Sequence, residues 1–337
     1  MKKLLVSPAP HIHSANTTSR MMLDVVIALI PAMIVSVLAY GLPALTVLLV
    51  SVVSCVLFEY LIQRFILKTK VTINDWSAAV TGVLLALNLP ACSPWWMILI
   101  GAIVAIGITK MTFGGLGQNI FNPALVARVL LLISFPAIMT NYTGPDAVPL
   151  TSMFASLAHV DATSGATALS AVTEGLSQGQ TIQQIFPEGH NYLSMLFFGI
   201  GGSAGEMSAL ALLIGFVYLL VRKVIRPHIP IAVIASMFVV SGIFWLIDPS
   251  QYTDPLFNIL TGGALLGAIY MATDYVTSPM EPKGMVIFGI GIGVLTMFIR
   301  YFGAYPEGMS FAILLMNAVV PLINKFVKAK RFSKEAK

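Results

Sequence analysis

A short run of small and hydroxyl-bearing residues, Asp161-Ala-Thr-Ser-Gly-Ala-Thr167, is the most specific chemical signal in the 337-residue sequence. Average residue usage gives the pattern Asp-x-x-Ser-Gly-Ala-Thr by chance in a chain of this length only about once in a few thousand cases. A threonine hydroxyl beside glycine and alanine can be approached closely and can act as a nucleophile. The alternative is a plain Ser/Gly/Ala turn, because such strings are common in loops.

The glycine-rich segment Gly114-Gly115-x-Gly117 is similar to a dinucleotide-binding loop, but no strand precedes it and the surrounding runs are predicted to be helical. As a dinucleotide signal it is negligible. We expect instead a non-helical break within a membrane bundle, followed by a helix that Asn122-Pro123 opens.

Metal chemistry and self-contained catalysis are not expected. His11 and His13 have one spacer between them and no acidic or cysteine partners, so a solvated segment is favoured over a metal site. Cys55 and Cys92 offer no metal-ligand or disulfide pattern, and Cys55 sits in an apolar run as a small hydrophobic residue would. Because no nucleophile–base–orienter set appears either, we predict no catalytic residue and no complete active site in this chain alone.

Several ionisable residues fall within or beside apolar runs, where they are costly in lipid and usually face the interior of a helix bundle. Of these, Asp24, Glu206 and Asp274 are the candidates for an ion route, with structural pairing as the alternative. Two others, Glu59 and Arg300, are interpreted as interfacial anchors that reach the headgroups. The full set is Asp24, Glu59, Arg128, Glu206, Asp274 and Arg300.

The elements that must position these groups are membrane spans. Hydrophobic residues make up 57% of the chain and charged residues 10%, against about 25% charged in soluble domains. Apolar runs of roughly span length occur ten times between Leu23 and Ile323. The net charge of +5 is thinly spread and gathers at the ends of these runs, so it does not indicate nucleic-acid binding.

The distribution of lysine and arginine predicts an orientation. Basic residues cluster in 64–70, 222–226 and 325–337, which are expected to be cytoplasmic, whereas 140–191 has no Lys or Arg and is expected on the extracytoplasmic side. Ten spans with both termini inside place each of these segments on the side that its charge predicts. The polar N-terminus has no apolar stretch of a cleavable signal peptide.

A weak internal repeat divides the chain into two halves. The segment 81–90 has its counterpart at 261–274, and 113–130 has its counterpart at 302–319. Because each half has five spans, the second copy is inverted, an architecture common in transporters. We therefore predict an all-α membrane protein with about ten transmembrane helices in two inverted five-helix repeats. One integral membrane domain covers 1–337: repeat one about 20–140, a loop about 140–191, repeat two about 192–325 and a basic cytoplasmic tail at 325–337.

Nearly the whole chain resembles, in order, the D subunit of the Rnf electron-transport complex. The homologous B subunit of the Na+-translocating NADH:quinone oxidoreductase shares much of the pattern. That subunit typically has a longer N-terminal extension, whereas this chain reaches the shared motif by Ser7, so the Rnf subunit is preferred. The matching segments are SPAPHIHSANTTSRMML (7–23), GGLGQNIFNPA (114–124), GSAGEMSALA (202–211), ATDYVTSPMEPKG (272–284) and RYFGAYPEGMSFAILLMNA (300–318).

The resemblance implies a cofactor. In that family the last threonine of Ser-Gly-Ala-Thr carries FMN through a phosphoester, installed by a flavin transferase from FAD. Here Thr167 would be the acceptor, with Asp161, Ser164, Gly165 and Ala166 as the context that the transferase recognises. The loop would then be an extracytoplasmic flavin-bearing loop. Breaks such as 114–117 are associated in the family with a non-covalent riboflavin or an ion path.

The resemblance also implies the setting. The chain would be a subunit of a ferredoxin:NAD+ oxidoreductase in a bacterial or archaeal cytoplasmic membrane that couples electron transfer to Na+ or H+ movement. Its partners would be the other membrane, iron–sulfur and flavin subunits, the flavin transferase and membrane lipid. Iron–sulfur clusters would lie in the other subunits, because two cysteines cannot ligate a cluster. A rival from another class is a small-solute channel or transporter without redox chemistry, which the inverted repeat would also suit.

Overall fold

The computed structural model describes residues 17–69, 71–143, 164–165, 167–186, 192–197, 201–303, 305 and 307–328. Within them the chain is almost entirely helical, apart from a two-residue antiparallel pairing that sets Tyr142 opposite Gly165 and Thr143 opposite Ser164. The strands of this pair are β1 (Tyr142–Thr143) and β2 (Ser164–Gly165). Predictions for His11, His13, Asp161 and Ala166 fall outside the described residues.

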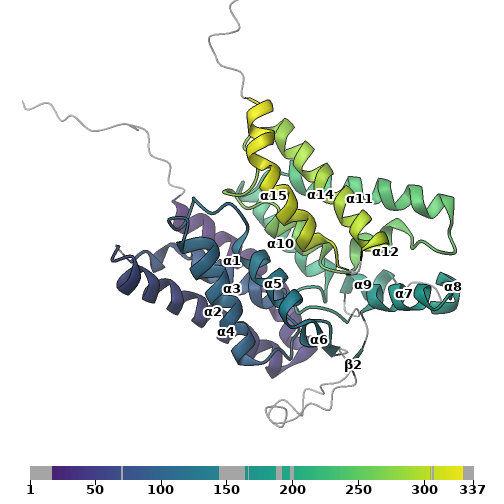
Figure 1. Cartoon of the computed structure of the whole chain (residues 1–337), viewed down its shortest axis with the longest axis horizontal. Coiled ribbons are helices and arrows are strands. Elements are labelled where there is room, and N and C mark those ends of the chain that lie inside the picture. Colours follow the sequence, from purple (N-terminus) through teal and green to yellow (C-terminus); the bar gives the residue numbers. More distant parts are fainter. Residues whose placement is uncertain are drawn as a thin grey trace, which may run out of the picture.

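The helices follow the two halves of the sequence as two groups, one from α1 to α6 and one from α10 to α15 (Figure 1), and α10 joins the groups because it packs chiefly against α1. The first group consists of α1 (Thr18–Tyr40), α2 (Leu42–Leu61, continued by a π-helical turn to Ile66), a 3-10 turn at Ile73–Asp75, α3 (Ser77–Leu87), α4 (Trp95–Ala102, continued as π-helix to Met111), α5 (Pro123–Ser134) and α6 (Pro136–Met139). The second consists of α10 (Ala209–Val221), α11 (His228–Ile247), α12 (Pro255–Leu260), α13 (Ala264–Leu266, continued as π-helix to Met271), α14 (Pro282–Phe302) and α15 (Met309–Phe326).

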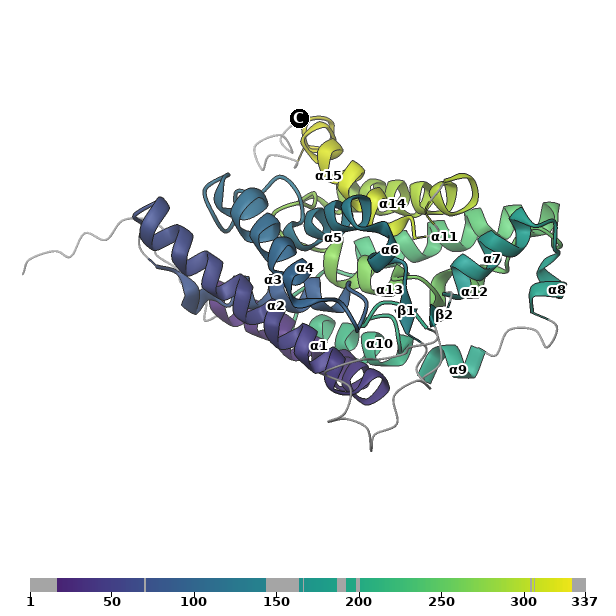
Figure 2. The same ribbon diagram turned by 60° about the horizontal axis from the view of Figure 1, so that its bottom comes forward.

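Three short helices connect the groups and project beside α12 (Figure 2). They are α7 (Ala168–Ser177), α8 (Ile182–Ile185) and α9 (Tyr192–Phe197). Leu169 and Val172 of α7 are buried in a small apolar cluster with Ile182, Met195 and Phe257. This cluster attaches α7 to α12 and so fixes the position of the residue just before α7, Thr167.

The long helices have the composition of membrane spans. Five described helices are long and apolar enough to cross a bilayer, and four further apolar helices are shorter. Large apolar side chains face outward, as at Val53 (63% exposed) and Leu246 (75% exposed), while several charged groups, such as Glu59 and Arg128, are buried. The protein is a multi-pass membrane protein, as predicted, because only lipid accommodates such an outer surface.

Two of the ten predicted apolar runs are interrupted inside the bundle. Helix α3 stops at Leu87, and the peptide N–H of Gly205 donates to the Leu87 carbonyl at 2.7 Å. Helices α12 and α13 are separated by Gly262 and Gly263, both in the left-handed region at φ +63° and +62°. A Cβ added at Gly205 would lie 2.9 Å from that same carbonyl, so the chain can pass there only without a side chain. Irregular backbone is tolerated at membrane depth where protein surrounds it.

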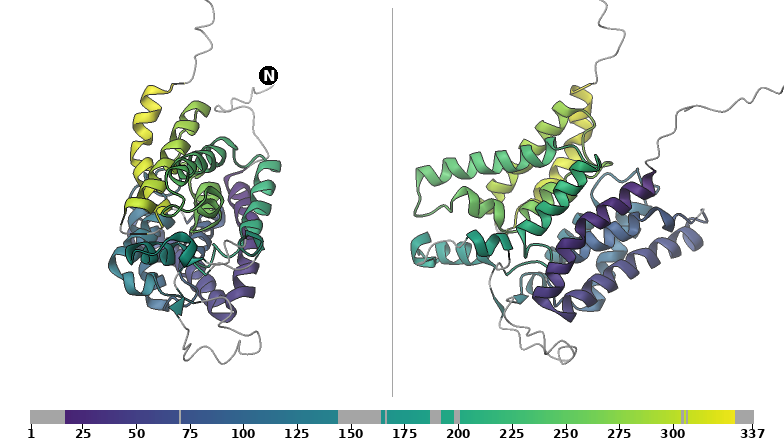
Figure 3. Two further views of the ribbon diagram at one scale, coloured as in Figure 1. Left: turned by 90° about the vertical axis from the view of Figure 1, so that its right-hand side faces the viewer. Right: turned by 180° about the vertical axis from the view of Figure 1, so that it is seen from behind.

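Helices α11 and α14 run side by side in the second group (Figure 3) and cross at a surface of small residues. A Cβ added at Gly293 of α14 would lie 2.7 Å from the Val233 carbonyl oxygen and would overlap the Ser236 Oγ. We expect Gly293→Ala to destabilise the protein by about 1–3 kcal/mol, because it overpacks backbone against backbone. The check is the apparent unfolding temperature in detergent.

The matched control is Gly291→Ala on the same helix. Its Cβ would meet only the flexible end of Met316, 2.6 Å from Cε, which can move away. Equal losses of stability for Gly291→Ala and Gly293→Ala would contradict the close-packing interpretation.

Candidate functional site

Thr167 occupies the N-cap of α7. Its Oγ1 accepts a hydrogen bond from the Ser170 backbone N–H at 3.1 Å and lies 2.8 Å from the Ser170 Oγ. The residue is 5% exposed. At a helix N-terminus, unpaired backbone N–H groups and a partial positive charge point toward any group attached to the side chain of the N-cap residue. The Thr167 hydroxyl therefore stands where a phosphate group would be favoured.

The two strands lead the chain to this cap. Ser164 and Gly165 pair with β1, which follows α6 of the first group. Of the sequence-predicted motif, Ser164, Gly165 and Thr167 thus lie at a junction between the two helical groups. Two residues after Thr167, the Leu169 side chain packs against the break between α12 and α13, because a Cβ added at Gly262 would overlap the Leu169 Cδ1.

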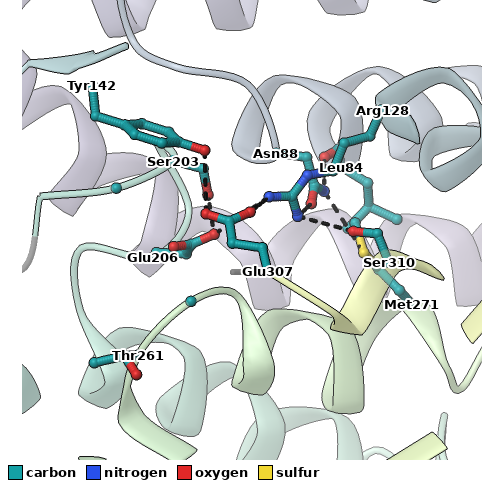
Figure 4. A network of polar contacts seen from close by, with 12 residues as sticks. Leu84, Asn88, Arg128, Tyr142, Ser203, Glu206, Thr261, Met271, Glu307 and Ser310 are labelled. Carbon is teal, nitrogen blue, oxygen red and sulfur yellow. Dashed lines mark hydrogen bonds and ion pairs between the residues drawn. The ribbon is translucent and has the colours of Figure 1, made fainter. Parts of the chain in front are cut away.

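A buried charge network lies between the two helical groups (Figure 4). Arg128 of α5 donates to a carboxylate oxygen of Glu307, which precedes α15, and its Nη2 lies 3.8 Å from a Glu206 oxygen. The Tyr142 hydroxyl donates to the other Glu307 oxygen at 3.2 Å. All four of these side chains are buried.

Neutral polar groups complete the network. Arg128 Nη1 donates to Asn88 Oδ1 at 2.8 Å and to Ser310 Oγ at 3.1 Å, and Ser203 Oγ donates to Glu206 at 2.6 Å. Charges removed from water persist only when they are paired and hydrogen-bonded. Sequence reasoning singled out Arg128 and Glu206 but missed Glu307, although this residue lies in the family-like segment 300–318.

Arg300 is not an interfacial anchor, contrary to the prediction. It is 6% exposed, and its guanidinium donates to the carbonyls of Asn258, Thr261 and Gly262 at 2.5, 2.9 and 2.9 Å. These are the carbonyls that the end of α12 leaves without helical partners. The Arg300 side chain is buried because it binds the free carbonyls at the break after α12. Sequence analysis did not connect this break to Arg300.

Glu59 is not an anchor either, because it is 0% exposed. Lys110 Nζ donates to a Glu59 oxygen at 2.7 Å and to the Ser77 Oγ at 2.6 Å, and Gln63 donates to the other Glu59 oxygen at 3.2 Å. This buried pair joins α2 to the π-helical end of α4. Sequence analysis did not single out Lys110, so its role was missed.

The two remaining candidates for an ion route differ in their surroundings. Asp24 is paired with Arg222 at 3.1 Å and accepts from the Tyr218 hydroxyl at 3.0 Å, the structural pairing that was the alternative. Asp274 accepts from Thr277 at 3.2 Å and lines a cavity of about 80 Å³. The cavity also contacts the segment 112–122 through Asn119 and Asn122 and is lined by Lys110.

Within the described part of the chain no three His, Cys, Asp or Glu side chains are grouped so that they could hold a metal ion. Cys55 is buried in the apolar core, in keeping with its interpretation as a small hydrophobic residue.

Comparison of the sequence with known proteins shows the family of the chain. The model of the NQR2, RnfD, RnfE family matches residues 5–333. The chain belongs to this family. The D subunit of the Na(+)-translocating ferredoxin:NAD(+) oxidoreductase complex of Acetobacterium woodii is 42% identical, covering 99% of this chain and 98% of that protein.

Two further relatives have similar coverage. The D subunit of the proton-translocating ferredoxin:NAD(+) oxidoreductase complex of Clostridium ljungdahlii is 38% identical, with 97% of this chain and 95% of that protein covered. The D subunit of the ion-translocating oxidoreductase complex of Halorhodospira halophila is 38% identical, with 96% and 94% covered. The resemblance stated from the sequence motifs is confirmed, and members of this family that resemble this chain are named for the movement of different ions.

Proposed function

We propose that this chain is the D subunit of an Rnf-type, ion-translocating ferredoxin:NAD+ oxidoreductase complex and carries FMN on Thr167. The observation that carries the proposal is the position of the motif threonine. In a family member with full-length similarity to D subunits, Thr167 caps a helix N-terminus at the junction of the two helical groups. The chain contributes to an oxidoreductase and holds no complete active site of its own.

The residues present fit a phosphoester-linked flavin. The N-terminal N–H groups of α7 suit a phosphate on the Thr167 oxygen, and the Ser164-Gly165-Ala166 context is small enough for a flavin transferase to approach. The flavin would supply the one- and two-electron chemistry. The protein's contribution is to hold the phosphate at the cap and to fix α7 against α12 through Leu169 and Val172.

The proposed topology is ten spans in two inverted repeats in the bacterial or archaeal cytoplasmic membrane. Both termini are cytoplasmic, and the loop 140–191 with its flavin is extracytoplasmic. The charge distribution supports this arrangement, as do the interrupted runs in each half, at the end of α3 and between α12 and α13. Other Rnf subunits, lipid and the flavin transferase are the partners.

The cavity beside Asp274 is the proposed place for either the ion path or a non-covalent riboflavin. It brings the 112–122 break of one half against the 272–281 connection of the other, and polar side chains that include Lys110, Asn119 and Asp274 interrupt a mainly apolar wall. Few polar groups in an apolar concave site are typical of cofactor and solute sites. Coupling follows if flavin reduction biases the helices between two ion-accessible states.

The test of the flavin is a denaturing gel. After co-expression with a flavin transferase, the wild-type band is expected to fluoresce under ultraviolet light, and Thr167→Val is expected to be dark because it has no hydroxyl to esterify. Ser177→Ala on the same helix is the control and keeps its fluorescence. A dark wild-type band would favour the non-redox channel instead.

Two measurements on the purified complex complete the test. Thr167→Val is expected to abolish ion transport coupled to ferredoxin oxidation, and normal pumping by this variant would remove the flavin from the coupling mechanism. The identity of the co-purifying subunits separates an Rnf complex from the Na+-translocating NADH:quinone oxidoreductase, whose B subunit is the related alternative.

A further inference from the structure

A cavity of about 170 Å³ lies between α7 and the region where α12 and α14 meet. One wall is the face of α7 that includes Leu169, Thr173 and Leu176. The opposite wall contains Tyr252, from the α11–α12 connection, and Tyr301 of α14. The mainly apolar lining and concave shape are those of a small-molecule site.

The cavity begins close to the proposed flavin acceptor. Its α7 residues lie two to nine positions after Thr167, about 3 to 14 Å along the axis at 1.5 Å per residue. A group tethered to the N-cap therefore reaches the cavity by lying along the side of the helix. Leu169, the first wall residue, packs on the Gly262 break, so this end of the cavity is fixed to the interior of the bundle.

The wall opposite α7 is aromatic. The Tyr252 and Tyr301 rings meet edge to face with centroids 4.9 Å apart, and the Phe244 ring lies behind them, 5.1 Å from Tyr252 and 5.2 Å from Tyr301. Aromatic faces and edges of this kind favour a further planar ring in offset or edge contact. The Tyr301 hydroxyl is held by Ser241 and Asn258 at 3.0 and 3.2 Å, which fixes the ring.

Arg300 also lines the cavity and has an unused donor. Its terminal nitrogens donate to the carbonyls at the end of α12, but its buried Nε–H has no hydrogen-bond partner among the described residues. Buried donors are rarely left unsatisfied, because the lost hydrogen bond costs free energy. A ligand that offers an acceptor oxygen or nitrogen to the Arg300 Nε–H suits this position. A ligand that becomes more negative on reduction would also be stabilised by the guanidinium charge.

We propose that this cavity receives the isoalloxazine ring of the flavin on Thr167, with Arg300 as the positioning and charge-stabilising residue for its acceptor edge. The inference rests on the proposed function, since it takes the flavin on Thr167 as given. The fixed positive charge of Arg300 stabilises the reduced, more negative flavin relative to the oxidised one. The ring lies against Tyr252 and Tyr301 and is shielded from solvent by α7.

The first test is the flavin midpoint potential in the purified complex, read by spectroelectrochemistry. Arg300→Gln is expected to make reduction at least tenfold less favourable, about 30 mV more negative for a two-electron couple. Arg300→Lys keeps the charge and is expected to remain near the wild-type value. A purely structural role would destabilise both variants without separating their potentials.

A second test leaves Arg300 intact. Thr173→Trp places a large side chain at the cavity wall and is expected to displace the ring, so that iodide quenches flavin fluorescence more than in the wild type. Ser177→Trp adds the same side chain at an exposed position of α7 away from the cavity and is expected to leave quenching unchanged.

The outcomes separate this inference from the proposed function. A fluorescent gel band with wild-type potential in Arg300→Gln and wild-type quenching in Thr173→Trp would place the ring elsewhere and overturn the inference, while the flavin on Thr167 would stand. A dark wild-type band would overturn both. Retained flavin with a lowered potential in Arg300→Gln and increased quenching in Thr173→Trp supports the cavity as the ring site.

Discussion

Arg128→Met is expected to destabilise the protein by about 3–5 kcal/mol, because it leaves two buried carboxylates without their shared cation. Glu307 loses its direct ion pair with Arg128, and Glu206 loses a cation 3.8 Å away. The loss is measured as the apparent unfolding temperature in detergent and as the amount of monodisperse protein recovered from membranes. Arg128→Lys is expected to be intermediate, since it restores the charge but not the planar set of donors that also reaches Asn88 and Ser310.

The control is the double variant Arg128→Met with Glu307→Gln. Removing one negative charge together with the positive one lowers the unpaired charge in the network, so the double variant is expected to be more stable than Arg128→Met alone. If the loss of the double variant relative to the wild type equals the sum of the losses of Arg128→Met and Glu307→Gln measured singly, the pair is not coupled and Arg128 acts through packing alone.

Lys110→Met is the second large expected loss, again about 3–5 kcal/mol from an uncompensated buried charge. Glu59 would remain fully buried with only the Gln63 amide as a donor. Lys110→Met with Glu59→Gln is expected to recover most of the stability, because the pair is removed as a unit. Lys283→Met, at an exposed lysine of α14, is the matched control and is expected to change the unfolding temperature little. A loss with Lys283→Met as large as with Lys110→Met would contradict the buried-pair explanation.

The sequence predicted the features that depend on local composition. A low charged fraction and long apolar runs are sufficient to predict a multi-pass membrane protein, because the bilayer admits few alternatives. The family could also be predicted from short sequence motifs. Residues in these motifs have specific structural roles, as Asn122 has at the N-cap of α5. The segments 81–90 and 261–274, which the sequence pairs as repeat counterparts, contain the end of α3 and the break between α12 and α13.

The partners of buried charges could not be predicted in the same way. Arg300 and Glu59 lie near run ends in sequence, where a long side chain normally reaches the headgroups. Their actual neighbours come from other helices: the broken end of α12 for Arg300 and Lys110 for Glu59. Such pairings depend on helix crossing and rotation, which periodicity does not determine in a chain that is apolar on nearly every face. The position of Thr167 at a helix cap also required the structure, because the hydroxyl motif gave no helix boundary.

The Arg128–Glu307 pair also has a consequence for biogenesis, since its members are 179 residues apart in the chain. At roughly 5–20 residues per second, translation delivers Glu307 about 9 to 36 s after Arg128. During that interval α5 is made with its arginine, while the carboxylate that neutralises it does not yet exist. The first five helices therefore leave the ribosome as an incomplete unit, and a membrane insertase that shelters α5 from lipid would be most needed before the last helix, α15, arrives.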